Sequence, residues 1–344
     1  MPCPDSALSR PSVLGILLTS HCNISCRHCC NSSGPTAHRS VDTATVAGLI
    51  DDAARIGTIT EIGLSGGEPF MFPRLLGDIL RHARDCGLAA SVTTNGFWGR
   101  SRRSGALLAG LKADGLTAVC ISTSQFHQEF IGIDTVVRAA GAALDAGLTV
   151  TVNVVSSAAL HPDAVRAALG DRADRVGVVV MPCLPAGRAA SMLDAAEFPE
   201  TSSRPLGSCH RHFDKLAVDL DGDVWPCCSP GGFTAPLRMG NIADAPVDRI
   251  VARSGANTLL AVLDTVGPAF FLPFLRRAEG LDDLPTQFSD PCHLCHAMLS
   301  SPRAAAVVQE ACDRLTDDIR RLPPEERPPG RLGRIAALAE QKAA

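Results

Sequence analysis

The stretch LLTSHCNISCRHCCNSSG, residues 17–34, holds four cysteines and two histidines within ten residues. Cys22, Cys26 and Cys29 have the spacing C-x3-C-x2-C, and Cys30 directly follows the third. The stretch could be a disulfide knot, a zinc site or the cradle of a metal cluster. Structural zinc usually takes four ligands from two short halves. Three thiolates on a tight loop instead suit a [4Fe–4S] cluster with one open iron, so the spacing favours a cluster over zinc or chance.

The composition describes an ordinary globular protein of 344 residues, with 46% hydrophobic and 20% charged residues. This length suits one large domain with a smaller satellite. A net charge of −4 offers no basic surface for nucleic acid and no basic helix for an anionic membrane. The apolar run at 13–18 is too short for a signal sequence or a membrane span. We therefore expect a cytoplasmic protein.

Fourteen cysteines need an explanation in such a chain, because cytosolic thiols stay reduced. Most of them gather in two groups, around residues 22–30 and 209–295, and grouping is what metal binding predicts. The isolated cysteines are expected to be small buried hydrophobes: Cys3, Cys86, Cys120 and Cys312.

Apolar runs alternate regularly with helical patterns up to about residue 185. Helical periodicity follows the capping candidate Asp42 and returns at 75–83 and 136–144. Strands buried on both faces and separated by helices predict an α/β fold with a parallel sheet. Six units are too few for a closed eight-fold barrel, which leaves a partial barrel or an open doubly wound sheet. The expected strands are 13–19, 60–65, 89–94, 117–122, 149–155 and 176–181.

The alternation fails after residue 190, which suggests a second domain. We expect an N-terminal extension at 1–11 and the α/β domain at 12–194. A small cysteine-rich α+β domain at 195–300 and a helical tail at 301–344 would follow, with helices at 302–321 and 331–343. The first cysteine group follows the first strand, at the carboxyl edge where α/β proteins place reactive groups.

The second expected strand ends in GLSGGEP, which contains Gly66, Gly67, Glu68 and Pro69. Two glycines let a ligand lie against the backbone, and a carboxylate can pair with an ammonium group. Alone, GGEP could be a plain turn. One strand after C-x3-C-x2-C, it completes a pattern that resembles the radical S-adenosylmethionine (SAM) superfamily.

This resemblance implies a partial (β/α)6 TIM-like barrel. It implies that Cys22, Cys26 and Cys29 hold a [4Fe–4S] cluster whose free iron binds the amino and carboxylate groups of SAM. A flavodoxin- or ferredoxin-type protein would donate electrons. An alternative of a different class is a non-catalytic metal-binding regulator, which would need neither SAM nor an electron donor.

The resemblance also implies which residues contact SAM. His28 would lie near the adenine, and Gly66–Pro69 would contact the ammonium group. Ser122 and Asn153 match strand positions that reach the carboxylate or ribose. The segment MPCLPAGRA, residues 181–189, resembles the turn after the sixth strand in members with auxiliary clusters. Each of these could equally be a cap or turn residue.

The later cysteines resemble the twitch domain, a shortened relative of the SPASM domain. The resemblance implies one auxiliary [4Fe–4S] cluster held by Cys209, Cys227, Cys292 and Cys295. The sequence VDLDGDVWPCC reads as a hairpin with a DG turn that delivers Cys227. No C-x5-C-x3-C run follows Cys295, so a second auxiliary cluster is not expected. The neighbouring histidines are expected to be spectators: His210, His212, His293 and His296.

Radical SAM chemistry implies that a 5′-deoxyadenosyl radical removes hydrogen from an unactivated carbon of the substrate. An auxiliary cluster can then accept an electron, or a thiol can return hydrogen and give epimerisation. Cys228 is the candidate thiol and Cys183 a weaker rival, although either could simply pack. His127 follows the fourth strand and could face the active site or the surface.

The substrate is the least defined part of the prediction. A ribosomally made peptide, epimerised or cross-linked, is the first hypothesis. A small-molecule natural product such as an aminoglycoside is the second. The apolar segment AFFLPFLRR, residues 269–277, could form a peptide groove but is expected to be hydrophobic core.

Overall fold

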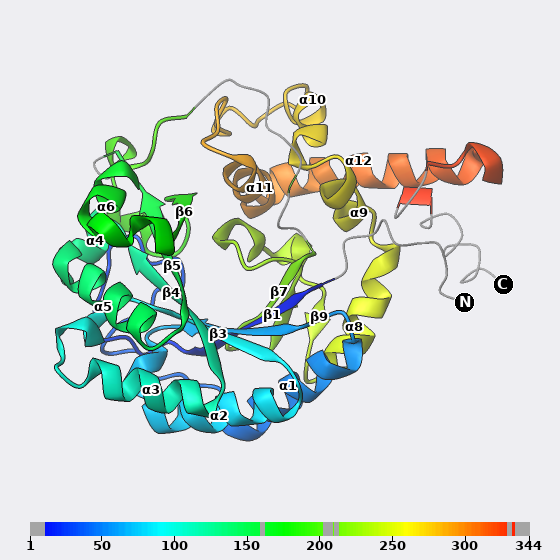
Figure 1. Ribbon diagram of the computed structural model, residues 1–344. Coiled ribbons are helices and arrows are strands. Elements are labelled where there is room, and N and C mark those ends of the chain that lie inside the picture. Colours follow the sequence, from blue (N-terminus) through cyan, green and yellow to red (C-terminus); the bar gives the residue numbers. More distant parts are fainter. Residues whose placement is uncertain (1–10, 159–161, 202–208, 210–212, 329–331, 334–344) are drawn as a thin grey trace. The chain divides into compact units, whose positions relative to one another are not determined.

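The protein is described by a computed structural model that covers residues 11–158, 162–201, 209, 213–328 and 332–333 (Figure 1). It divides into two compact units. The first, called the core unit, consists of Ser12–Glu200 and Val218–Asp221. The second, called the cysteine-rich unit, contains the remaining described residues.

Six parallel strands form the sheet of the core unit in the order β1-β2-β3-β4-β5-β6. Strand order therefore follows chain order, as right-handed βαβ crossovers require in a barrel wall. The prediction of six parallel strands is confirmed. Their bounds are Val13–Thr19, Glu61–Gly66, Ala89–Thr94, Leu116–Thr123, Thr149–Ser156 and Gly177–Pro182.

The connecting helices α1, α2, α3 and α5 all cover the outer side of the curved sheet (Figure 1). A doubly wound sheet would have helices on both faces, so the core unit is the partial TIM-like barrel of the two alternatives. The helices of the core unit are α1 (Thr43–Ile56), α2 (Pro73–Asp85), α3 (Ser104–Asp114), α4 (Gln125–Gln128), α5 (Ile133–Asp145), α6 (Pro162–Leu169) and α7 (Ala189–Met192).

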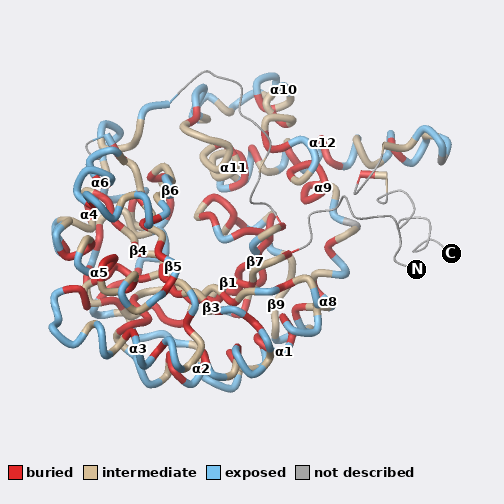
Figure 2. The backbone as a smooth tube through the Cα atoms, viewed as in Figure 1, coloured by how far each residue is buried: buried red, intermediate tan, exposed pale blue. Residues whose placement is uncertain are grey.

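Strands β1 to β5 are buried mainly on one face and half-buried or exposed on the other, and β6 has no buried residue, which corrects the expectation of burial on both faces (Figure 2). On β4, for example, Val119 and Ile121 are buried, whereas Cys120 and Ser122 are partly accessible. The half-buried positions carry small or polar residues, including Ser91 and the strand residue Asn153. The barrel therefore has an apolar outer layer under the helices and a polar inner face.

Local sequence signals explain where α1 begins and ends. The Asp42 side chain accepts a hydrogen bond from the Thr45 N–H at 2.9 Å, which confirms Asp42 as the N-cap. The helix ends at Gly57, whose φ of 72° is in the left-handed region. The next helix, α2, begins at Pro73. Proline is favoured in the first turn because a backbone N–H there would have no partner within the helix, so its absence costs nothing.

A β-hairpin precedes Cys227, and residues Val218–Asp221 at its turn are assigned to the core unit. Strands β7 (Lys215–Val218) and β8 (Asp223–Trp225) are neighbours, and Gly222 in the turn has a φ of 79°. The predicted hairpin is thus present, and it leads directly to Cys227. Strand β9 (Gly240–Asn241) pairs antiparallel with β8. The helices of the cysteine-rich unit are α8 (Val247–Arg253), α9 (Thr258–Thr265), α10 (Leu272–Leu275), α11 (Pro291–Ser300) and α12 (Pro302–Arg321).

The apolar segment 269–277 belongs to the core of this unit, as expected. Phe271 is fully buried, and Phe270 and Phe274 pack against the same cluster. The expected helix at 302–321 is confirmed as α12, and Cys312 is buried within its packed face. The expected helix at 331–343 lies outside the described residues, apart from positions 332–333.

Among the described residues, no single helix has the length and apolar character to cross a membrane. One bent pair, Thr258–Thr265 with Pro268–Leu275, meets those criteria only when its two halves are counted together.

Candidate active site

The first cysteine group lies on a closed loop that follows β1. The Cys22 N–H donates to the Gly34 carbonyl and the Cys29 N–H to the Cys26 carbonyl, each at 3.2 Å. Cys22 and Cys26 are buried, and Cys29 is partly accessible. These bonds fold the loop back on itself.

The three thiols act on one another electrostatically. Burial raises the pKa of Cys22 to about 11, and the charges of Glu68 and Cys29 add to the effect. Burial also raises the pKa of Cys26, with Cys29 and Cys22 the next contributors. Such mutual influence requires neighbouring sulfurs. Because thiolates crowded in a buried site need a positive partner, this donor set fits an iron–sulfur cluster.

The two glycines of the GGEP motif let β2 pass close to the cysteine loop. A Cβ on Gly66 would lie 2.4 Å from the Thr19 carbonyl oxygen, and one on Gly67 would lie 2.0 Å from that of His21. The Gly67 N–H donates to Thr19 at 2.5 Å. Both glycines are therefore required by backbone contact with the cysteine loop, a reason that the sequence pattern does not reveal.

Glu68 is fully buried and its carboxylate is held by the protein itself. One oxygen accepts bonds from Thr94 Oγ1 at 2.7 Å and Phe70 N–H at 3.1 Å, and the other accepts from Asn95 N–H at 2.7 Å. Burial raises the pKa of Glu68 to about 7, although these donors oppose the shift. Glu68 thus joins the ends of β2 and β3, and the expected contact with a SAM ammonium stays a prediction.

The turn after β6 also contacts the cysteine loop. The Arg188 N–H donates to the Cys29 carbonyl and Arg188 Nε to the Cys26 carbonyl, both at 3.0 Å. A Cβ on Gly187 would lie 2.2 Å from the Cys30 carbonyl oxygen, and its φ is 59°. The Gly-Arg pair of MPCLPAGRA is therefore a backbone clamp on the loop.

His28 lies in an aromatic group at the carboxyl end of β4. Its ring stacks on Phe126 with centroids 5.1 Å apart and meets His127 edge-on at 4.6 Å. Burial lowers the pKa of His28 to about 4, and the nearby charges of Arg188 and Arg27 lower it further. Burial likewise lowers the pKa of His127, whose Nδ1 is 2.8 Å from Ser124 Oγ. Through its edge-on contact with His28, His127 touches the cysteine loop.

Several buried polar atoms around this edge have no hydrogen-bond partner among the described residues. Ser122 and Asn153, both predicted to contact SAM, are register partners on β4 and β5, and Asn153 Oδ1 is one of these atoms. Buried polar groups are normally paired, so such atoms fit the cofactor that the cysteine pattern implies. The others from the core unit are His28 Nδ1, Ser33 Oγ, Gln125 Oε1, Ser157 Oγ and Arg188 Nη2.

Sequence reasoning missed two further contacts of the cysteine loop. Arg27 forms ion pairs with Glu197 at 2.8 Å and with Glu129 at 3.2 Å, and it lies over the Phe126 ring at 5.0 Å. Asn95 Nδ2 lies 3.8 Å from the Cys22 sulfur. These partners are far apart in sequence and form no motif.

The second cysteine group is also brought together. Burial raises the pKa of Cys227, and the charges of Cys228, Cys209 and Cys292 raise it further. Burial raises the pKa of Cys295 as well, followed by the charges of the other three cysteines. All four predicted ligands therefore lie near one another. Like the first group, this four-thiol set fits an iron–sulfur cluster.

Two glycines make room around these sulfurs. A Cβ on Gly232 would lie 2.1 Å from Cys227 Sγ, and one on Gly231 would lie 2.5 Å from the Cys292 carbonyl oxygen. Ser229 Oγ and Thr234 Oγ1 are buried without partners among the described residues. Hydroxyl groups in such positions suit a cluster, because hydrogen bonds to its sulfurs tune its potential.

The remaining predicted residues have varied positions. The His293 ring accepts from the Ser289 N–H at 3.2 Å, and His296 Nδ1 is 3.0 Å from Ser300 Oγ, so both engage neighbouring serines. Cys228 is exposed and Cys183 is buried. His210 and His212 lie outside the described residues.

Two family models match this chain. Residues 16–162 match the Radical SAM superfamily, and residues 209–272 match SPASM, an iron–sulfur cluster-binding domain. The chain belongs to the radical SAM enzymes. Within that superfamily it carries a C-terminal SPASM-type domain. The first domain binds a [4Fe–4S] cluster with SAM, and the second binds auxiliary iron–sulfur clusters. These matches set aside the hypothesis of a non-catalytic metal-binding regulator.

The chain is similar to several curated proteins. It is 25% identical to the putative peptide biosynthesis protein YydG of Bacillus subtilis (strain 168), over 84% of this chain and 92% of that protein. It is 33% identical to the PqqA peptide cyclase of Ruegeria pomeroyi over 27% and 25% of the two chains. It is 33% identical to the GTP 3′,8-cyclase of Streptomyces coelicolor over 44% and 46%. The chain thus spans less than half of either cyclase.

Solved structures of low sequence identity also align. One is native anSMEcpe with bound AdoMet and the Cp18Cys peptide, with 14% identity over 90% of this chain and 99% of that chain and a TM-score of 0.49. Another is BtrN in complex with AdoMet and 2-DOIA, with 17% identity over 74% and 87% and a TM-score of 0.44.

Proposed function

We propose that this radical SAM enzyme modifies a ribosomally made peptide, by epimerisation or by cross-link formation. The observation that carries the proposal is the similarity to YydG, a putative peptide biosynthesis protein, which extends over 84% of this chain and 92% of that protein. The match to PqqA peptide cyclase supports it over a shorter segment.

The site supports an assignment of roles to this chain's residues. Cys22, Cys26 and Cys29 hold the first cluster, which when bound supplies the electron that cleaves SAM. His28, the Gly66–Pro69 turn, Ser122 and Asn153 line the SAM site. The orphaned Asn153 Oδ1 and His28 Nδ1 support this part, because each lacks a partner within the described residues.

The cysteine-rich unit holds one auxiliary [4Fe–4S] cluster through Cys209, Cys227, Cys292 and Cys295. We assign the SAM-cleaving domain to 12–194, the auxiliary domain to 195–300 and a helical tail to 301–344. A flavodoxin- or ferredoxin-type protein delivers the electron that starts each turnover.

Epimerisation requires a hydrogen donor after the substrate radical forms. The 5′-deoxyadenosyl radical takes a hydrogen atom from a peptide Cα, leaving a carbon radical and 5′-deoxyadenosine. A thiol then gives a hydrogen atom to the opposite face, so an S–H bond breaks and a C–H bond forms. The resulting thiyl radical returns to a thiol by taking one electron from the reducing protein and one proton from water. Cys228 is assigned this role because its thiol is exposed beside a cluster ligand.

The test begins with a search for a short precursor-peptide gene beside this one, and the encoded peptide is then incubated with the enzyme in deuterated water with SAM and dithionite. Epimerisation adds one deuterium to the peptide, because thiol hydrogens exchange with solvent, whereas cross-linking removes two hydrogens. Cys228→Ala is expected to form 5′-deoxyadenosine while losing the epimerised product. Unchanged product from that variant would remove Cys228 from the mechanism, and no peptide modification by the wild type would refute the proposal.

A second candidate function is oxidation or epimerisation of a small-molecule natural product such as an aminoglycoside. The short matches to GTP 3′,8-cyclases, whose name specifies a small-molecule substrate, favour keeping it. Sugar-processing genes beside this one would support it, and a short precursor-peptide gene would support the peptide.

A further inference from the structure

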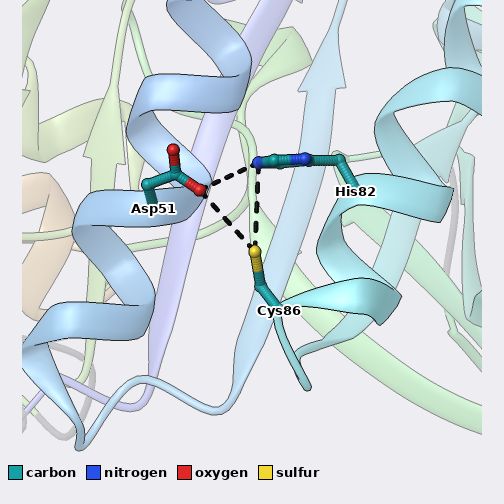
Figure 3. A group of neighbouring side chains, drawn as sticks. All are labelled: Asp51, His82 and Cys86. Carbon is teal, nitrogen blue, oxygen red and sulfur yellow. Dashed lines mark hydrogen bonds and ion pairs between the residues drawn. The ribbon is translucent and has the colours of Figure 1, made fainter.

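Three side chains with metal-binding atoms meet on the outer helices of the core unit. Asp51 comes from α1, and His82 and Cys86 come from α2 and its C-cap (Figure 3). His82 Nε2 lies 2.9 Å from Asp51 Oδ1, and Cys86 Sγ lies 3.6 Å from the same oxygen. The sulfur is 3.9 Å from His82 Nε2. The three atoms thus form a compact triangle that the cluster sites do not use.

The helices themselves set up this arrangement. His82 and Cys86 are four residues apart, which places them on the same face of α2. The Cys86 N–H donates to the His82 carbonyl at 3.0 Å and holds the C-cap in place. Asp51 reaches them from the neighbouring helix α1 (Figure 3). Donors on rigid elements give a more defined metal geometry than donors on loops.

The triangle has the size that tetrahedral zinc requires. With bonds of about 2.0–2.1 Å to nitrogen, 2.3 Å to sulfur and 2.0–2.2 Å to oxygen, the edges are about 3.6 Å for N–S, 3.6 Å for S–O and 3.4 Å for N–O. The observed edges of 3.9, 3.6 and 2.9 Å differ from these by about 0.5 Å or less. Small side-chain rotations would close that difference.

The surroundings of Cys86 favour a metal-ligand role over the role of a buried packing residue. Cys86 was expected to be a small buried hydrophobe, which is wrong, because its sulfur is partly accessible and donates to a carboxylate. The side chains of Asp51 and His82 are 50% and 38% exposed, so an ion and a water ligand can enter. A salt bridge between His82 and Asp51 alone would not place a thiol against both partners.

We propose that Asp51, His82 and Cys86 bind a zinc ion, with water as the fourth ligand. One thiolate, one imidazole and one carboxylate suit zinc, whereas calcium and magnesium prefer oxygen ligands alone. The ion links α1 to α2, the two helices that flank β2 and its GGEP turn, and therefore acts as a structural clip.

The test measures alkylation of Cys86 in the full-length enzyme with its iron–sulfur clusters loaded. The protein is incubated anaerobically with or without zinc sulfate and treated with iodoacetamide, and label at Cys86 is quantified by peptide mass spectrometry. Zinc is expected to slow labelling of wild-type Cys86 roughly tenfold or more, because the thiolate is both the nucleophile and the metal ligand, so a zinc-bound thiolate is withheld from the reagent. Iron content is measured in parallel.

His82→Ala and Asp51→Ala are expected to lose most of this protection. Both side chains are partly exposed, so the variants are expected to fold. Arg84→Ala, two residues from His82 and outside the triangle, is the matched control and is expected to keep the protection. Equal labelling with and without zinc in the wild type would overturn the site. Equal protection in His82→Ala, or protection that appears only when iron is lost, would also overturn it.

Discussion

Replacing Gly187 with alanine tests whether the turn after β6 clamps the cysteine loop. Gly187 has a φ of 59°, and an added Cβ would lie 2.2 Å from the Cys30 carbonyl oxygen and 2.7 Å from that of Cys29. Real Cβ atoms do not approach a carbonyl oxygen so closely, so either the turn or the loop must move. Movement of the turn would break the 3.0 Å bond from the Arg188 N–H to Cys29.

Gly57→Ala is the matched control for this prediction. Gly57 has a φ of 72°, and no atom lies within 4 Å of its added Cβ. Both variants therefore carry the strain of a left-handed alanine, about 1–2 kcal/mol. Gly187→Ala adds a steric penalty of about 1–3 kcal/mol and a lost hydrogen bond worth about 0.5–1.5 kcal/mol. The difference between the two variants is the cost of disturbing the clamp.

The assay compares thermal unfolding and 5′-deoxyadenosine formation in anaerobically reconstituted protein. Gly57→Ala is expected to lower the unfolding midpoint by roughly 3–6 °C and to leave SAM cleavage near the wild-type rate. Gly187→Ala is expected to lower the midpoint by roughly 10 °C or more. It is also expected to slow SAM cleavage about 100-fold, because a displacement near 1 Å has that effect on a positioned reaction. Equal midpoints and equal rates for the two variants would refute the clamp.

Three further predictions concern both cysteine groups and their supports. Cys22→Ala is expected to abolish 5′-deoxyadenosine formation, and the triple variant of Cys22, Cys26 and Cys29 to lower iron from roughly eight to about four per chain. Substantial 5′-deoxyadenosine from Cys22→Ala would reject the ligand assignment. Glu68→Gln is expected to cost about 1–3 kcal/mol in the free energy of unfolding, because an amide NH2 must replace an oxygen that accepts buried bonds. A denaturation curve equal to the wild type would show that Glu68 does not need its charge. Phe271→Ala is expected to destabilise the cysteine-rich unit by about 3–5 kcal/mol, because Phe271 is fully buried, whereas the partly buried Phe270 should cost less when truncated. Equal losses from the two truncations would argue against this packing.

Features that depend on neighbouring residues were predictable from the sequence. The strand and helix periods predicted six parallel strands, and the structure contains them within one or two residues of the expected bounds. The cap at Asp42, the helix at 302–321 and the Asp-Gly hairpin before Cys227 are equally local signals. Local patterns succeed because periodicity and capping act over only a few residues.

The partnerships of the site were decided by the tertiary structure. Arg27 pairs with residues 102 and 170 positions away, and Asn95 reaches the Cys22 sulfur across 73 positions. The sequence predicted glycines at the GGEP turn for a ligand, and the folded chain gives them a second reason, which is contact with the cysteine loop. Likewise, the apolar runs in the sequence did not indicate that one face of the strands is partly exposed.

By itself, the sequence determined the class of protein, since the cysteine spacing, the glycine turn and the strand periods are written in consecutive residues. Only the tertiary structure decided what those residues touch, because strand crossovers bring the cysteine loop, the GGEP turn and the Gly187–Arg188 turn to one edge. The same packing of α1 on α2 makes Asp51, His82 and Cys86 neighbours, although 31 and 35 positions separate Asp51 from the other two. Contacts of that kind depend on the path of the chain, which no short motif encodes.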